Sequence, residues 1–142
     1  MKRGEVYWAE LPLGYGRRPV VVLTRSAVAD VRTRVTVAPV TRRARSIRSE
    51  VPVGRAEGLR RTSVVNVDNV LTVPKEALET EPIGRLTQTT RRRLDAALRW
   101  ALDIRHEQPQ GVRADRRPVR SRSRPGHVPD RPPSTAPCAR AG

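Results

Sequence analysis

The residues from Pro19 to Thr24 form an almost continuous apolar run, PVVVLT, and this run limits the possible folds more than any other feature. β-Branched valines favour an extended backbone, and a strand that is apolar at nearly every position has to be covered on both faces. A second run of the same kind, VTVAPV, occupies residues 35–40. We therefore expect the two runs to be partner strands, the first of them buried on both sides.

Shorter β-type runs accompany this pair at residues 5–9, 50–53, 63–67 and 70–73, separated by clusters of Gly, Pro and Arg. Short, regularly spaced strands are typical of a small barrel. The last patterned segment differs, because its apolar residues recur with the spacing of one helical face. These residues are Leu94, Ala97, Leu98, Ala101 and Leu102.

The pattern thus predicts a mainly β fold, a small barrel with a C-terminal helix within residues 87–105. Thr87 or Thr89 is suited to cap the first helical turn. Beyond Arg105 the chain contains no Leu, Ile or aromatic residue, but seven Pro, three Gly and eight Arg. Such a segment cannot bury enough apolar surface to offset its ordering entropy. We therefore expect one domain, residues 1–105, and a disordered tail, residues 106–142, which is either an auxiliary phosphate-binding arm or without a role.

The net charge of +15, from 29 Lys and Arg against 14 Asp and Glu, indicates a polyanionic partner. Most of the basic residues are Arg, whose planar fork binds phosphate through two hydrogen bonds, so nucleic acid is the first candidate. The alternative is that an Arg-rich composition reflects high-GC coding.

Other classes of protein do not fit the sequence. No apolar run is long enough to span a bilayer, and no hydrophobic signal core follows the N-terminus, so we expect a cytoplasmic protein without a membrane partner. The single cysteine, Cys138, cannot form a disulfide or a Cys-based zinc site within one chain. We expect neither a metal nor a cofactor.

A simple strand register brings Arg18 and Thr41 together. If the two apolar runs pair antiparallel with Thr24 opposite Val35, paired positions sum to 59, as do 18 and 41. Partners in such a ladder have Cα atoms about 4.5 to 5.5 Å apart. Pro39 cannot donate to the ladder, so we also expect a bulge that re-aims Thr41.

An arginine beside a hydroxyl suits a phosphodiester. Arg18 can clamp phosphate oxygens and neutralise the charge that develops when a ribose 2′-OH attacks phosphorus, while Thr41 donates to or orients the same group. The alternative is that both are ordinary solvated strand ends. Neighbouring residues extend the site into a track for single-stranded RNA, with Tyr15 as a stacking face and Trp8 expected in the core. The expected RNA-binding residues are Tyr15, Arg17, Arg42, Arg43 and Arg45.

Several segments, in order and at fitting intervals, resemble one known family. They are residues 2–8 (KRGEVYW), 18–23 (RPVVVL), 37–41 (VAPVT), 63–69 (SVVNVDN) and 83–86 (IGRL), followed by the closing helix. This pattern is similar to the MazF/PemK toxins of type II toxin–antitoxin systems. The resemblance covers residues 2–104 and excludes the tail.

The resemblance implies an SH3-like β-barrel of the MazF/CcdB type that forms a homodimer. The implied activity is that of a sequence-specific, metal-independent endoribonuclease, an mRNA interferase that cuts single-stranded RNA and inhibits translation and growth. The products would carry a 2′,3′-cyclic phosphate and a 5′-hydroxyl, and an acidic, MazE-like antitoxin would cover the RNA groove.

The family's essential arginine and its essential Thr or Ser map onto Arg18 and Thr41. Asp68 and Asn69 match a family position that we interpret as supporting the site or the dimer, with a plain strand-end turn as the alternative. The first loop is shorter than in many members and lacks their glutamate. Two other functions on the same fold stay open: a gyrase-poisoning toxin, for which Trp100 is the only support, and a non-catalytic module that binds RNA or DNA.

Overall fold

Seven strands follow one another in residues 1–105, the part of the chain that the computed structural model describes. They are β1 (Glu5–Leu11), β2 (Gly16–Val22), β3 (Arg34–Thr41), β4 (Glu50–Val53), β5 (Ser63–Asn66), β6 (Leu71–Pro74) and β7 (Gly84–Arg85). The helices are α1 (Ser26–Val31) and α2 (Gln88–Ala101), with 3-10 turns η1 (Arg55–Glu57), η2 (Val67–Asn69) and η3 (Lys75–Ala77). The tail predicted for residues 106–142 lies outside the described residues.

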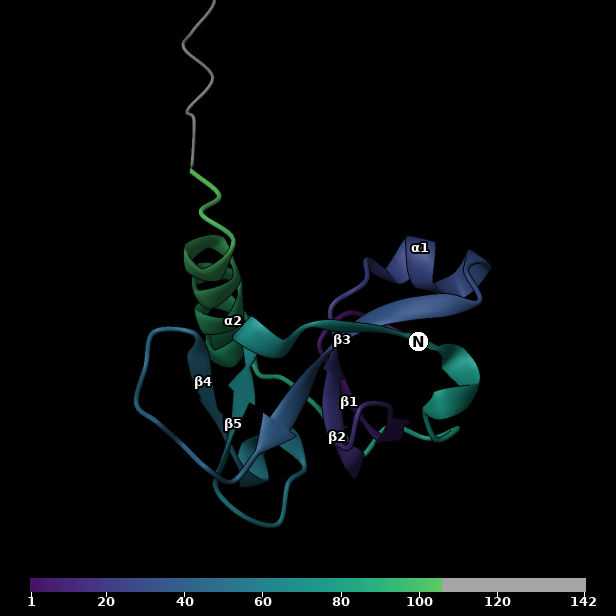
Figure 1. Cartoon of the computed structure of the whole chain (residues 1–142), viewed down its shortest axis with the longest axis horizontal. Helices are drawn as coiled ribbons and strands as arrows, with labels where there is room; N and C mark the ends of the chain where they lie inside the picture. Colours follow the sequence, from purple (N-terminus) through teal and green to yellow (C-terminus); the bar gives the residue numbers. More distant parts are fainter. Residues whose placement is uncertain (106–142) are drawn as a thin grey trace, which may run out of the picture. The chain divides into compact units, whose positions relative to one another are not determined.

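The strands form one curved sheet in the order β4-β5-β3-β2-β1-β7, with β6 also paired to β3. β3 belongs to both halves of this sheet (Figure 1). Its earlier residues pair with β2 and β6, whereas Val40 and Thr41 pair with β5. The strand therefore carries Thr41 out of one half of the sheet and into the other.

The predicted register between the two apolar runs is confirmed, because paired positions of β2 and β3 sum to 59 throughout their ladder. That ladder ends at Pro39, which has no N–H to donate. Arg18 pairs instead with β1, and Thr41 with β5. The prediction that Arg18 and Thr41 are direct ladder partners is therefore wrong.

Two hydrophobic cores lie on opposite faces of the central strands. Val21 belongs to one core and Val20 to the other, as the alternation of side chains along a strand requires. Leu94 and Ala97 of α2 close the first core, and Ala29 of α1 closes the second. In Figure 1, α2 stands beside β4 and β5, and α1 lies at the other end of β3. The prediction of a strand covered on both faces is confirmed.

The C-terminal helix begins where the sequence predicts, since the Thr87 hydroxyl accepts a hydrogen bond from the Thr90 backbone N–H at 3.1 Å. It ends at Ala101, however, so Leu102 is outside the helix and 61% exposed. The predicted helix was too long at this end. No helix within residues 1–105 has the length and apolar character that crossing a membrane requires.

Candidate nucleic-acid interface

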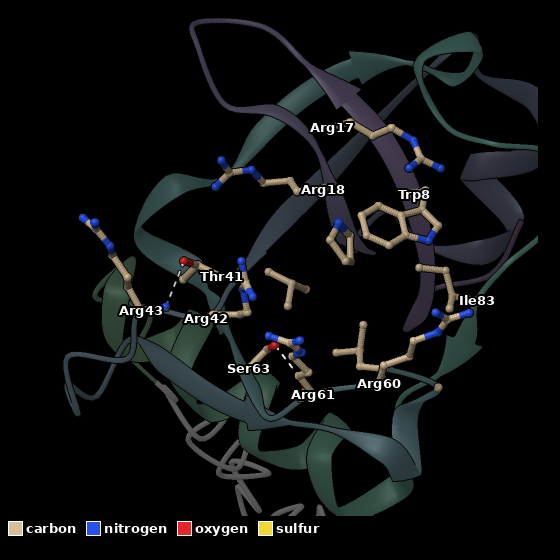
Figure 2. A pocket seen from close by; sticks show the side chains of 14 residues that line it. Trp8, Arg17, Arg18, Thr41, Arg42, Arg43, Arg60, Arg61, Ser63 and Ile83 are labelled. Carbon is tan, nitrogen blue, oxygen red and sulfur yellow. Dashed lines mark hydrogen bonds between the residues drawn. The ribbon is translucent and has the colours of Figure 1, made fainter.

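A cavity of about 960 Å³ opens between β2, the end of β3 and the segment that joins β4 to β5. Apolar side chains and arginines line it together, and Figure 2 shows the labelled ones. The lining residues are Trp8, Arg17, Arg18, Pro19, Val40, Thr41, Arg42, Arg43, Gly58, Leu59, Arg60, Arg61, Ser63 and Ile83. We call this space the large cavity.

A second cavity, of about 120 Å³, adjoins it and is called the small cavity. Arg18, Thr41 and Arg43 line both spaces, so the structure does place Arg18 and Thr41 at one site although they are not ladder partners. The remaining residues that line the small cavity are Tyr15, Pro39, Arg45, Glu50, Asn66 and Asn69.

Arg17 and Arg18 are neighbours in β2, and their side chains diverge (Figure 2). The Arg17 guanidinium lies 4.6 Å from the centre of the Trp8 ring, and its Nε donates to Glu79 Oε1 at 3.2 Å within an ion pair. Arg17 is thus held by protein partners at the rim of the large cavity. Trp8 was expected in the core; it is only partly buried, because it lines the large cavity, where Arg17 stacks on its ring.

Arg18 is oriented by the turn that precedes it. Its Nε donates to the Tyr15 carbonyl oxygen at 2.7 Å, and its guanidinium lies 5.2 Å from the centre of the Tyr15 ring. Its two terminal nitrogens have no hydrogen-bond partner within residues 1–105. The predicted stacking residue Tyr15 therefore positions Arg18, and the arginine keeps its outer donors for a ligand.

Thr41 is half-buried at the end of β3 and begins the loop that carries the next arginines. Its hydroxyl oxygen accepts a hydrogen bond from the Arg43 backbone N–H at 3.2 Å, which leaves the hydroxyl proton available to a ligand (Figure 2). Arg42, Arg43 and Arg45 are exposed on this loop. Arg42 lines the large cavity and Arg45 the small one.

Glu50, at the start of β4, is a site residue that the sequence did not reveal. Its Oε2 accepts the backbone N–H groups of Arg45 and Ser46, at 2.7 and 3.0 Å. Ser46 has a positive φ of 57°, so this contact holds the loop in an unusual turn. The other oxygen, Oε1, is buried and has no hydrogen-bond partner in residues 1–105.

Asp68 and Asn69 have different positions. The Asp68 carboxylate accepts a hydrogen bond from the buried Ser49 hydroxyl at 2.5 Å, and the Asp68 N–H donates to Asn66 Oδ1 at 2.9 Å. Asp68 lines neither cavity, whereas Asn66 and Asn69 line the small one. Asp68 thus links the turn after β5 to Ser49, just before β4, and the supporting role expected for it stays a prediction.

The far wall of the large cavity holds residues that the sequence interpretation also missed, Arg60, Arg61 and Ser63. The Ser63 hydroxyl donates to the Arg61 carbonyl oxygen at 3.1 Å and so fixes the turn before β5 (Figure 2). Two adjacent arginines before a predicted strand were the available signal. Nothing in their spacing showed that they line the same cavity as Arg42.

This wall is anchored by Glu57, which is buried at 5% exposure. Its carboxylate accepts the Gly54 N–H at 2.8 Å and the Thr90 hydroxyl at 2.7 Å, which ties the wall to α2. The Glu57 carbonyl lies so close to Gly84 that no side chain fits there. β7 and the wall therefore meet backbone to backbone.

The clearest pKa shift lies away from both cavities. The buried Tyr7 hydroxyl donates to Glu5 Oε2 at 2.8 Å, and burial together with this carboxylate raises the pKa of Tyr7 to about 12. For Glu5, burial alone would raise the pKa, but hydrogen bonds from the Lys2 N–H and the Tyr7 hydroxyl outweigh it and lower the pKa. In residues 1–105 no three His, Cys, Asp or Glu side chains are grouped so that they could hold a metal ion.

These features define a class: a small, strongly curved β protein with a C-terminal helix and an arginine-lined cleft that fits a polyanion. Residues 2–102 match the family model described as "PemK-like, MazF-like toxin of type II toxin-antitoxin system". The chain belongs to this family.

Curated relatives and solved structures agree with this assignment. The chain is 41% identical to "Endoribonuclease MazF3" of Mycobacterium tuberculosis over 87 residues, 61% of this chain and 84% of the relative. It is 40% identical to "Probable endoribonuclease MazF5" of the same species over 102 residues, 71% of this chain and 92% of the relative.

Two of the similar solved structures are also mycobacterial. One, titled "Mycobacterium tuberculosis toxin MazF-mt6", has a TM-score of 0.66 at 38% identity over 71% of this chain and 98% of its own. The other, "Endoribonuclease in complex with its cognate antitoxin from Mycobacterial species", has a TM-score of 0.66 at 30% identity over 74% of this chain and 97% of its own. The predicted fold class, mainly β with a C-terminal helix, is confirmed.

Proposed function

We propose that this protein is the toxin of a type II toxin–antitoxin system and cuts single-stranded RNA as a sequence-specific endoribonuclease that needs no metal. The observation that supports this most directly is that Arg18 and Thr41 line both cavities and present free donors there. The names of the two curated relatives reported above, one an endoribonuclease and one a probable endoribonuclease, support the same reaction. Cellular RNA as substrate places the activity in the cytoplasm.

In the proposed reaction the ribose 2′-oxygen attacks the adjacent phosphorus. The bond from the 2′-oxygen to phosphorus forms and the bond to the 5′-oxygen breaks; the 2′-OH proton leaves to solvent and the 5′-oxygen takes one up. The products are a 2′,3′-cyclic phosphate and a 5′-hydroxyl. The terminal nitrogens of Arg18 donate to the phosphate oxygens as negative charge builds up, and the Thr41 hydroxyl donates to the same group.

Charge around the pair supports a strand of RNA as the ligand. Arg42 and Arg43 at the end of β3, and Arg60 and Arg61 in the segment before β5, all line the large cavity and offer positive charge to a phosphate backbone. The apolar floor between them, with Trp8, offers contact area to unpaired bases.

The decisive experiment maps both ends of a defined RNA after incubation with the protein in the presence of EDTA. We expect cuts at a defined short motif, and we expect Arg18→Ala to lower the cleavage rate by about 10²- to 10³-fold, the cost of losing one oxyanion donor. Arg92→Ala, an exposed arginine on α2, is the charge-matched control. Cleavage that requires a divalent cation, or an unimpaired Arg18→Ala variant with native circular dichroism, would contradict the proposal.

The alternative functions are separated by two further readouts. Trp100 is 52% exposed, with the Arg48 guanidinium 5.9 Å from the centre of its ring, and it is the feature that a gyrase-poisoning toxin would use. Inhibition of supercoiling without RNA products would establish that function. RNA or DNA binding without products or supercoiling inhibition would establish a non-catalytic module.

We further propose an acidic, MazE-like antitoxin and a homodimer as the working assembly. One similar solved structure is titled as a complex of an endoribonuclease with its cognate antitoxin. An acidic segment would complement the charge of the arginines that line the large cavity. Cleavage should stop when the proposed acidic antitoxin is added to the protein. In analytical ultracentrifugation, the protein alone should sediment with twice the mass of one chain. A monomeric active protein would exclude the dimer.

A further inference from the structure

One oxygen of Glu50 is left without a function by the reaction proposed above. Oε2 alone anchors the loop through Arg45 and Ser46, while Oε1 is buried and unpartnered within residues 1–105. A buried acceptor without a partner is destabilising, because it has lost its hydrogen bonds to water and gained none from the protein. A carboxylate placed in this way is prepared for a hydrogen-bond donor that arrives with a ligand.

The small cavity around Glu50 has the composition of a site for a nucleobase. Tyr15 supplies an aromatic face, and Asn66 and Asn69 supply amide groups. The side-chain carbonyl oxygen of Asn66 accepts the Asp68 N–H, so the amide NH2 of Asn66 is the group that can donate a hydrogen bond to a ligand. Unpaired RNA bases are recognised in this way, by stacking and by hydrogen bonds to their polar edges.

The position of the small cavity relative to the Arg18/Thr41 pair decides which base it would hold. Both residues line the small cavity as well as the large one, so a phosphate held between them has its own nucleotide beside the small cavity. Arg43 and Arg45 are long, exposed side chains that line the same space.

We propose that the small cavity is a base-recognition subsite adjacent to the cut phosphate, in which Glu50 Oε1 accepts a hydrogen bond from an N–H donor on the base edge. Glu50 is then a specificity-determining residue. This inference rests on the proposed ribonuclease function and names the part of that site that selects the sequence.

Glu50→Gln separates the two oxygens of the side chain. The amide keeps one acceptor, which is enough to hold the Arg45 and Ser46 N–H groups, but replaces the other acceptor with a donor. Glu50→Ala removes both. Glu10→Gln, an exposed carboxylate of β1 that lines neither cavity, is the matched control.

The experiment cuts a randomised RNA library with the wild type and the three variants and ranks the cleaved sequences. We expect Glu50→Gln to change the base preference at one position next to the cut by about tenfold or more in relative kcat/KM, the usual effect of one hydrogen bond to a charged group, and to leave the other positions unchanged. Glu10→Gln should reproduce the wild-type preference.

A second arm of the experiment uses RNA in which the preferred base at that position is modified so that it has no N–H donor. The N–H is methylated, or the amino group is replaced by hydrogen. This RNA should be a poor substrate of the wild type, while Glu50→Gln should barely distinguish it from the normal RNA, since the two changes remove the same hydrogen bond. Thermal melting checks that the amide variant is folded.

Two results would overturn the inference. An equal loss of rate on every sequence would make Glu50 an anchor of the loop only, and an unchanged preference would mean that water satisfies the free oxygen. Failure of the proposed ribonuclease function appears separately, as a wild type that cuts no RNA.

Discussion

The large and the small cavity differ in the chemistry of their walls, although they share Arg18, Thr41 and Arg43. The large cavity combines an apolar floor with an arginine rim, and none of the described residues that line it is a carboxylate. The small cavity mixes arginines with Glu50, Asn66, Asn69 and one aromatic ring. Positive charge alone binds any phosphate backbone, whereas a mixed set of donors and acceptors distinguishes one base from another.

We propose a separate task for each space: the large cavity holds the RNA strand, the small cavity selects the sequence, and the reaction takes place where the two cavities meet. The two arginines of β2 differ in the same way, because Arg17 is held by other side chains of the protein. Its stacking on Trp8 and its ion pair with Glu79 make it part of the wall, so Arg18 is the arginine of β2 with donors to offer. Changes to each space should therefore have different signatures.

The largest effect in this comparison is expected where the cavities meet. Thr41→Val keeps the shape of the side chain but removes the hydroxyl, and we expect the cleavage rate to fall by about 10²-fold with little change in RNA affinity or in sequence preference. Single-turnover kinetics measure this. Thr41→Ser should retain most of the activity, and a valine variant that cuts at the wild-type rate would place the chemistry elsewhere.

The position of Thr41 shows which part of the strand pairing could be predicted from the sequence and which part could not. The register of β2 and β3 was predictable, because two valine-rich runs leave few pairings that keep both cores apolar. The exit of β3 from that ladder was not, since it depends on β5 being available to pair with Val40 and Thr41. Arg18 and Thr41 meet through the bend of the sheet.

An intermediate effect is expected when the rim of the large cavity is changed. Arg60→Ala combined with Arg61→Ala removes two arginines that we propose bind phosphate, so RNA affinity should fall on the order of tenfold at low salt. The slope of log affinity against log salt should decrease by about 0.7 for each arginine–phosphate ion pair that is removed. Fluorescence anisotropy over a salt series measures both quantities.

The cleaved motif of this double variant should stay that of the wild type. Arg92→Ala combined with Arg93→Ala makes the same charge change on exposed residues of α2, outside both cavities, and serves as the control. If the rim variant cut a new motif, the division of tasks between the two cavities would be wrong.

Residues such as Arg60 and Glu50 were beyond prediction for a physical reason. A carboxylate at the start of a strand looks like a solvated end, and it becomes part of a site only because the folded loop turns two N–H groups toward it. Helix α1 was missed because it has six residues, no side-chain cap and no acidic first turn. The buried apolar pattern can be predicted from the sequence, whereas the conformation of loops that depend on tertiary packing cannot.

The smallest effect on activity is expected away from both cavities, at Tyr7. Tyr7→Phe removes the hydrogen bond to Glu5 and should lower the free energy of unfolding by about 1 to 2 kcal/mol near neutral pH without changing cleavage.

The stabilisation from this hydroxyl depends on pH in a defined direction. The pKa of Tyr7 is about 12 in the folded chain against 10.0 for a free tyrosine, so the contribution is complete below pH 10 and is lost as the pH rises toward about 12. Because the pKa of Glu5 is lowered from 4.5, its contribution is lost on the acid side, as the pH falls below that value. The free energies of unfolding of the wild type and Tyr7→Phe, measured by denaturant titration, should therefore differ by a constant amount between about pH 6 and 9. The two values should converge at either pH extreme. A stability difference that persists unchanged at pH 12 would show that the hydroxyl bond to Glu5 does not carry the effect. Any change in cleavage would mean that this region is coupled to the cavities.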